Sequence, residues 1–230
     1  MRERPVRSTE IESQIYRWPT PRAKAWMINL VHTASSDRNI VAIIAVGSAV
    51  RPTVQSADLD LMLVCREPAR SRLMPPIEVD LRAYAASKVD ALIAGGHDML
   101  GWGVKFGETL FQRDGFWDAV LAKWKRRLPL PSAQTSARRA DAAFERLTKV
   151  FELGDRNAAQ EQAVSYLTHL ARAELLRKRV YPASRPELPK QLRAKGSLAI
   201  AKSLERLLDR RYEDSDEVAS LIERRRHAHV

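Results

Sequence analysis

VGSAVRPTVQSADLDL, residues 46–61, is the stretch that decides the fold, and it continues the apolar run IVAIIAV at residues 40–46. The run has the length and the Ile/Val content of a buried strand, which predicts a strand over residues 40–46. Asp58 and Asp60 then alternate with leucines, so both carboxylates share one face of a second strand. Holding like charges together on rigid backbone is costly unless a cation neutralises them. The pattern therefore predicts a cation site on this strand.

A third carboxylate, Asp80, lies in IEVDLRAY, residues 77–84, where apolar and polar residues alternate again. The alternation predicts another strand, and Asp80 joins Asp58 and Asp60 if that strand pairs beside theirs. Mg²⁺ takes oxygen ligands and is usually held by a few carboxylates together with substrate phosphates. Three carboxylates can hold two such ions, one at the attacking oxygen and one bridging the phosphates. The sequence therefore predicts a Mg²⁺ site, with two ions, on these three residues.

Gly47 and Ser48 directly follow the first predicted strand and are expected to bind phosphate. A glycine at a strand end lets the backbone approach a ligand closely, and the following N–H groups and the Ser48 hydroxyl can donate to phosphate oxygens. Arg51 adds a charged donor that suits the same triphosphate. A Gly-Ser turn or an Asp-Leu-Asp strand is, taken singly, more often structural. Their occurrence together, with all three carboxylates, favours a functional site.

In these residues the chain resembles the DNA polymerase β-like nucleotidyltransferase superfamily, whose signature is hydrophobic-Gly-Ser, a gap, Asp-hydrophobic-Asp and a later single Asp. The matching residues are Gly47, Ser48, Asp58, Asp60 and Asp80. Arg51 stands where many members carry arginine, whereas Pro52 stands where glycine is common. The match is dense over residues 40–84 and thin elsewhere.

The resemblance implies both a fold and an activity. The fold is an α/β catalytic domain with a small mixed sheet followed by an all-α helical bundle, as in bacterial minimal and aminoglycoside-type nucleotidyltransferases. The activity is transfer of a nucleoside monophosphate from a nucleoside triphosphate, with ATP as the expected donor, to an acceptor hydroxyl, with release of pyrophosphate. The acceptor stays open between a small molecule such as an aminoglycoside-like compound, an RNA and a protein. A catalytically inactive nucleotide-binding module, or a toxin–antitoxin partner, is the alternative.

Charge and cysteine content narrow the functional classes. Lys and Arg outnumber Asp and Glu by 39 to 28, which gives a net charge of +11 and a pI near 10.1. Such a field attracts polyanions, nucleic acid and nucleoside triphosphates among them, although the basic residues are spread over several segments. The single cysteine, Cys65, excludes an intramolecular disulfide framework and fits a reducing, cytoplasmic environment. We expect neither a secretory signal nor a membrane span, because no long apolar run occurs.

Composition predicts three regions along the chain. Residues 1–20 are charged and contain prolines, which predicts an N-terminal arm; residues 21–128 are the expected catalytic domain; and residues 137–230 are expected to form a helical domain. The segment LPLPSAQTS, residues 128–136, is the predicted linker. Apolar periodicity predicts helices over residues 22–34, 87–93, 116–127, 137–153, 158–180, 198–210 and 217–226. Ser87 is expected to cap the second of these helices.

Residues 98–115 are harder to assign from their pattern. Trp102, Val104 and Phe106 alternate as in a strand, and several glycines interrupt a regular helix. Residues 109–111 suggest one more short strand. Related nucleotidyltransferases end the catalytic sheet with a Gly-containing helix and a strand, so the resemblance places those elements here.

The helical region contains candidates for acceptor chemistry. Acceptor activation needs a base beside the incoming hydroxyl, and Glu174 is a candidate because the resemblance to aminoglycoside-type enzymes implies a helical-domain glutamate with that task. Surface pairing of Glu174 with Arg177 or Lys178 is the alternative. Lys190 is a candidate for contacting the triphosphate from the same region.

Overall fold

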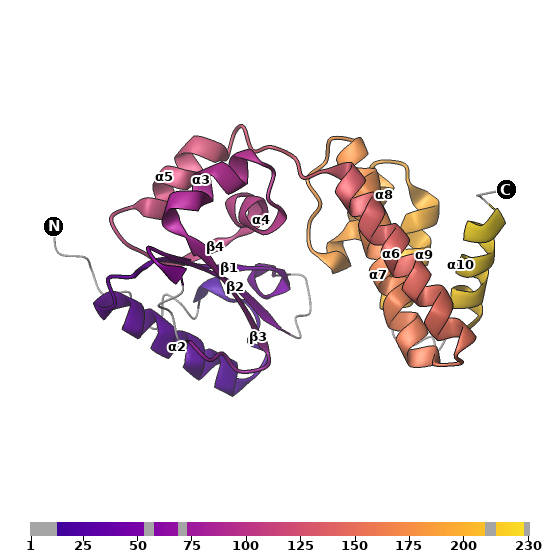
Figure 1. Cartoon of the computed structure of the whole chain (residues 1–230), viewed down its shortest axis with the longest axis horizontal. Helices are drawn as coiled ribbons and strands as arrows, with labels where there is room; N and C mark the ends of the chain where they lie inside the picture. Colours follow the sequence, from indigo (N-terminus) through magenta and orange to yellow (C-terminus); the bar gives the residue numbers. More distant parts are fainter. Residues whose placement is uncertain (1–12, 53–57, 69–72, 210–214, 228–230) are drawn as a thin grey trace. The chain divides into compact units, whose positions relative to one another are not determined.

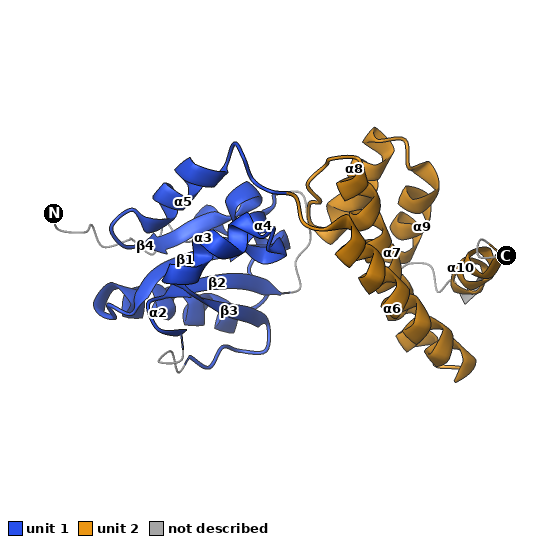
Figure 2. Ribbon diagram, turned by 45° about the horizontal axis from the view of Figure 1, so that its top comes forward, with its two compact units in different colours: residues 1–129 blue, residues 130–230 orange. Residues whose placement is uncertain are grey.

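The computed structural model describes residues 13–52, 58–68, 73–209 and 215–227 of the 230-residue chain. The chain divides into two compact units, Met1–Pro129 and Leu130–Val230, which are coloured separately in Figure 2. The boundary falls inside the predicted linker. Each unit has a buried apolar core of its own and is described by itself. Within the described residues, no helix combines the length and the apolar content needed to cross a membrane.

Unit 1 is built on a four-stranded mixed sheet with the strand order β3-β2-β1-β4 (Figure 1). The strands are β1 (Ile40–Val46), β2 (Leu59–Cys65), β3 (Val79–Ala85) and β4 (Glu108–Gln112). β1 is antiparallel to both β2 and β4, whereas β2 and β3 run parallel. Because β1 and β2 lie inside the sheet and helices cover both faces, their residues are almost entirely buried.

Helices cover the two faces of this sheet (Figure 1). The helices are α2 (Pro21–Ser36) on one face and α3 (Ala86–Ala94), α4 (Asp98–Phe106) and α5 (Phe116–Trp124) on the other. Because side chains alternate along a strand, neighbouring residues pack on opposite faces of the sheet. Ile43 and Leu61 pack on the α2 side, and Ile44 and Met62 pack on the side of α3, α4 and α5. Asp60, two residues before Met62, belongs to the latter face.

α4 lies close to the sheet because of two glycines, Gly103 inside the helix and Gly107 directly after it. A Cβ atom at Gly103 would be 2.1 Å from Met62 Cε, and one at Gly107 would be 2.9 Å from Ile44 Cγ2. At Gly107 a Cβ would also meet backbone at 2.6 Å, so the approach requires glycine there, whereas at Gly103 it would meet the flexible end of Met62. The glycines that interrupt the sequence pattern therefore specify helix–sheet packing. α4 and β4 confirm the helix and strand expected from the resemblance.

The described part of unit 2 is helical. Its helices are α6 (Ala133–Glu152), α7 (Arg156–Arg177), α8 (Leu188–Ala194), α9 (Leu198–Leu208) and α10 (Ser215–His227), with the short 3₁₀ helix η3 (Arg185–Glu187) before α8. α6 and α7 form a hairpin (Figure 1), in which Gly154 turns the chain at φ +77° and Asp155 caps α7. Side chains from all five α-helices share one apolar core.

The fold class is confirmed: an α/β unit with a small mixed sheet precedes a helical region. The strand over residues 40–46 is also confirmed at both ends. Of the predicted N-terminal arm, residues 1–12 lie outside the described residues, and Ile15 and Trp18 pack into the core on the α2 side.

Three local predictions are wrong. Ser87 does not cap α3, because the helix begins one residue earlier and Ala85 occupies the N-cap. The third strand begins at Val79 and not at residue 77, where Ile77 sits in a turn with 97% of its surface exposed. α6 begins at residue 133, inside the predicted linker, because the Ser132 side chain accepts a hydrogen bond from the Thr135 N–H and caps the helix.

Candidate functional site

The candidate site lies at one end of the sheet, where three strands bring predicted residues together. β2 and β3 pair in register so that Asp60 is opposite Asp80. On its other side Asp60 is opposite Val46, the last residue of β1, and Gly47 follows directly. Neighbouring strands lie about 4.8 Å apart, and residues in register point to the same face. The two carboxylates are therefore adjacent on the face that carries α3, α4 and α5.

Gly47 is in direct contact with Asp60. A Cβ atom at Gly47 would lie 2.1 Å from Asp60 Oδ2, so the carboxylate rests against the bare backbone. The backbone of Gly47 has φ +78° and ψ −156°, a conformation that is open to glycine and strained for any residue with a side chain. Both the conformation and the contact therefore require glycine here.

Ser48 and Arg51 follow Gly47 at the same end of the sheet. Ser48 begins the 3₁₀ helix η1 (Ser48–Val50), and the Arg51 N–H donates to the Ser48 carbonyl oxygen and closes it. The Arg51 guanidinium lies 5.2 Å from the ring centroid of Phe106, which in turn packs against Trp102. A cation–π contact of this kind helps to hold an arginine in place. The turn thus places a glycine, a hydroxyl and a cation beside the carboxylates.

Arg82 is a site residue that the sequence interpretation missed. Its Nη2 donates to Asp80 Oδ2 at 2.8 Å, and its Nε lies 3.2 Å from Oδ2 and 3.4 Å from Oδ1. The hydrogen bond with Asp80, together with smaller effects that include the charge of Asp60, raises the pKa of Arg82 above its ordinary value. The signal in the sequence was the i, i+2 spacing, which puts Asp80 and Arg82 on one face of a strand.

Asp58 directly precedes β2 and is exposed, and residues 53–57 before it lie outside the described residues. Across the ranges that the structure describes, no group of three or more His, Cys, Asp or Glu side chains is arranged to hold a metal ion. The donors at the site are nevertheless of the kind that a hard divalent cation takes, because carboxylate oxygens are the preferred ligands of Mg²⁺. The Asp60 carboxylate lies against Gly47, and the strand register places Asp60 opposite Asp80. The residues present therefore fit such an ion.

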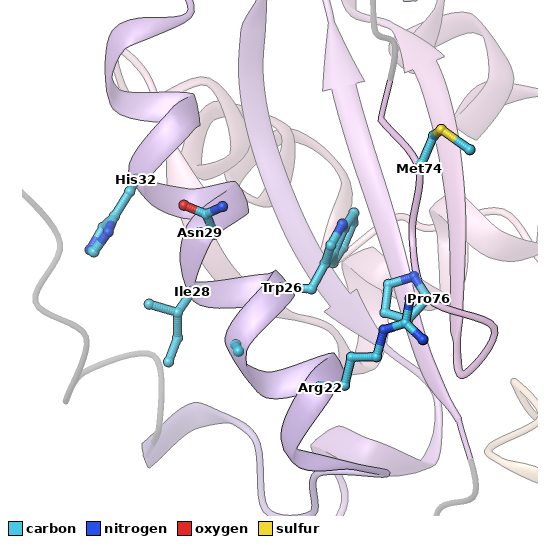
Figure 3. Close-up of a pocket in the computed structure, with 8 residues that line it drawn as sticks. Arg22, Trp26, Ile28, Asn29, His32, Met74 and Pro76 are labelled. Carbon is cyan, nitrogen blue, oxygen red and sulfur yellow. The ribbon is translucent and has the colours of Figure 1, made fainter.

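A separate hollow of about 640 Å³ lies between α2 and the segment that precedes β3 (Figure 3). Arg22 and Trp26 from the helix, with Met74 and Pro76 from the segment before β3, line part of it. α2 covers the face of the sheet opposite to Asp60, so this hollow is not part of the carboxylate site. None of the residues predicted to be functional lines it.

Glu174 and Lys190 belong to unit 2. Glu174 accepts a hydrogen bond from the Ser197 hydroxyl at 2.9 Å and pairs with Lys178 at 3.0 Å and, more loosely, with Arg177 at 3.7 Å. The hydrogen bonds from Lys178 and Ser197 lower the pKa of Glu174 below its ordinary value. The surface pairing considered as an alternative is therefore present. Lys190 lies on α8 and is exposed.

Comparisons with known proteins add a similarity in structure. No protein-family model matches the chain, and no curated protein matches it either. The crystal structure of a nucleotidyltransferase-like protein from Exiguobacterium sibiricum is similar at 18% identity over 86% of this chain and 69% of that chain, with a TM-score of 0.43. A similarity of this size carries no functional argument, so the function has to be argued from the geometry of the site.

Proposed function

We propose that unit 1 is the catalytic domain of a metal-dependent nucleotidyltransferase, which moves a nucleoside monophosphate from a nucleoside triphosphate to an acceptor hydroxyl and releases pyrophosphate. The observation that carries the proposal is the pairing of Asp60 with Asp80 in register, with Asp60 resting on the Gly47 backbone. Two adjacent carboxylates favour positive charge, because it relieves their mutual repulsion. Arg82 supplies one such charge to Asp80, and the carboxylate oxygens of the pair are the ligands that a divalent ion prefers.

Asp58, Asp60 and Asp80 would hold Mg²⁺ in this enzyme. When bound, the ion would neutralise the carboxylates and polarise the phosphate oxygens of the donor. The chain contributes rigidity, since Asp60 and Asp80 stand on paired strands and the Gly47 contact limits where the Asp60 carboxylate can go. A rigid pair loses little freedom when it binds an ion or a substrate.

Gly47, Ser48 and Arg51 would hold the triphosphate. The backbone conformation that Gly47 allows turns the chain from β1 into η1, and the Ser48 hydroxyl at the start of η1 is a donor for phosphate oxygens. The Arg51 guanidinium lies above the Phe106 ring and would offset the negative charge that moves to the leaving pyrophosphate. ATP is the proposed donor.

The proposed reaction is an in-line displacement. The acceptor hydroxyl oxygen bonds to the α-phosphorus, the bond from that phosphorus to the pyrophosphate oxygen breaks, and the hydroxyl proton passes to a base. Glu174 remains a predicted base. Its lowered pKa makes it a weaker proton acceptor than an ordinary glutamate, because Lys178 and Ser197 stabilise its charged form. Replacement by Gln would test this role directly.

An anionic acceptor such as RNA fits the protein's charge better than a cationic aminoglycoside does. The net charge of +11 attracts polyanions and repels polycations. If the acceptor is RNA, retention of the protein on RNA should weaken steeply with salt, because phosphate contacts release counterions. Salt-insensitive retention would favour a small-molecule or protein acceptor.

The test is a transfer assay with the full chain, Mg²⁺ and each nucleoside triphosphate radiolabelled at its α-phosphate. Total RNA, cell protein and a panel of aminoglycosides are supplied separately as acceptors. Label on one acceptor class supports the proposal and identifies the substrate. Binding of nucleotide without transfer to any acceptor would favour the inactive nucleotide-binding alternative.

A further inference from the structure

The Arg82 guanidinium lies where a cation would bind Asp80. Its Nη2 is hydrogen-bonded to Oδ2 and its Nε approaches both oxygens of the carboxylate. Asp80 has only these two oxygens to offer as ligands. An ion that takes Oδ2 has to displace or loosen the arginine, because Nη2 and Nε already bind that oxygen. An ion that takes Oδ1 still meets the repulsion of the neighbouring guanidinium charge.

The position of β3 makes this exchange possible. β3 is the edge strand of the sheet, and 54% of the Arg82 side chain and 41% of the Asp80 side chain are exposed. An arginine that is half exposed on a long flexible stem can leave its partner and enter solvent at small cost. A buried arginine in the same place would block the site permanently.

We propose that Arg82 is a determinant of cation affinity at the Asp60–Asp80 pair: it neutralises Asp80 while no metal is present and competes with the metal for that carboxylate. The proposal rests on the proposed function, since it takes the pair to be a metal site. Arg82 also lies within reach of the Asp60 charge, so its influence extends over both carboxylates. The competition raises the metal concentration at which the site is half occupied.

The expected size of the effect follows from the strength of exposed ion pairs. Such a pair contributes little, and its removal should tighten cation binding about two- to fivefold. A purely structural role on the edge strand, where charged residues discourage pairing with another sheet, predicts no change in cation affinity. The two roles therefore differ in a measurable quantity that does not depend on enzyme turnover.

The experiment is titration of the nucleotide-free full chain with Mn²⁺, with free Mn²⁺ followed by electron paramagnetic resonance. The variant is Arg82→Gln, and the matched control is Arg38→Gln, which removes the same charge from an exposed position before β1, at the end of that strand away from Gly47. We expect tighter Mn²⁺ binding in Arg82→Gln by about two- to fivefold and no such change in Arg38→Gln. The charge-preserving variant Arg82→Lys should stay near the parent protein.

Two negative results have different meanings. If the parent protein and Arg82→Gln bind Mn²⁺ with equal affinity, Arg82 does not compete with the metal and the inference is overturned, while the proposed function stands. If none of the proteins binds Mn²⁺, both the inference and the metal site fail. A tightening of the same size in Arg38→Gln would also overturn the inference, because it would show a general effect of net charge.

Discussion

Replacement of Gly47 by alanine should damage both the stability of unit 1 and its cation site. An alanine Cβ would lie 2.1 Å from Asp60 Oδ2, well inside contact distance, so the carboxylate has to leave its position beside Asp80. The backbone at Gly47, with φ +78° and ψ −156°, is in a region that residues with a side chain rarely adopt. The substitution therefore combines backbone strain with displacement of a proposed metal ligand.

The expected loss of stability in Gly47→Ala can be compared with that of the same substitution at a second glycine of unit 1, Gly115. Strain at Gly47 should cost about 1–3 kcal/mol, and moving the carboxylate adds about 1 kcal/mol, for a loss of about 2–4 kcal/mol in the free energy of unfolding. Gly115 also has positive φ, +66°, but a Cβ there meets no atom within 4 Å. Gly115→Ala should therefore cost only about 1–2 kcal/mol, the usual cost of a left-handed residue.

Tryptophan fluorescence gives an assay confined to unit 1. The five tryptophans all lie between residues 18 and 124, within Met1–Pro129. Urea unfolding followed by fluorescence should rank the parent protein above Gly115→Ala and Gly115→Ala above Gly47→Ala. Mn²⁺ affinity should fall at least about tenfold in Gly47→Ala, because a ligand is displaced, and stay unchanged in Gly115→Ala. Equal stability of the two variants, with Mn²⁺ binding intact in Gly47→Ala, would refute the assigned contact.

Two further predictions concern the cores of the units. Gly107→Ala should destabilise unit 1 by about 1–3 kcal/mol in the same urea assay, because the new Cβ would lie 2.6 Å from a backbone atom. Gly103→Ala should cost less, because its Cβ would meet the mobile end of the Met62 side chain. A larger loss of stability in Gly103→Ala than in Gly107→Ala would contradict the packing of α4. In unit 2, Glu217 is 7% exposed, and its pKa is held below its ordinary value by Arg224, Arg206 and Ser203 against the opposing effect of burial. Because the pKa of Glu217 is lower in the folded state, the ionised side chain stabilises the fold at pH values above its unfolded-state pKa. This stabilisation is lost as the pH falls through the folded-state pKa. Urea unfolding followed by circular dichroism should therefore show lower stability at pH 3.5 than at pH 7. Glu217→Gln should lower the free energy of unfolding by about 1–3 kcal/mol at pH 7 and make it less dependent on pH. The exposed control Glu145→Gln should do neither. If the stability of Glu217→Gln depends on pH as that of the parent protein does, the Glu217 network is not the source of the pH dependence.

The sequence predicted the centre of unit 1 because its signals are local. An apolar run of seven residues bounded by polar residues and a glycine can form little other than a buried strand, and β1 matches it at both ends. The alternation around Asp60 and Asp80 fixed their faces, and the expectation that their strands are neighbours is met by the pairing in register. Pattern and topology therefore agree where the candidate site lies.

Other features depend on tertiary packing, and their local signals in the sequence are ambiguous. The glycines around α4 disfavour a helix by propensity, yet Gly103 and Gly107 allow the helix to approach Ile44 and Met62, and packing overrides propensity. The partner of Arg82 was equally hidden, because a guanidinium on an edge strand can point to solvent or to a neighbour. Spacing alone does not distinguish the two.

The most direct test of the central claim compares Asp60→Asn with a matched control in the transfer assay. Asp114→Asn is the control, because Asp114 is an exposed carboxylate beyond β4, and its φ of +52° suits asparagine. We predict that Asp60→Asn folds as the parent protein does and loses transfer of the α-labelled nucleotide, that Asp114→Asn retains it, and that removing Mg²⁺ with a chelator abolishes it in both the parent protein and the control. Undiminished transfer by Asp60→Asn, or transfer in the presence of chelator, would contradict the carboxylate site as the centre of the reaction.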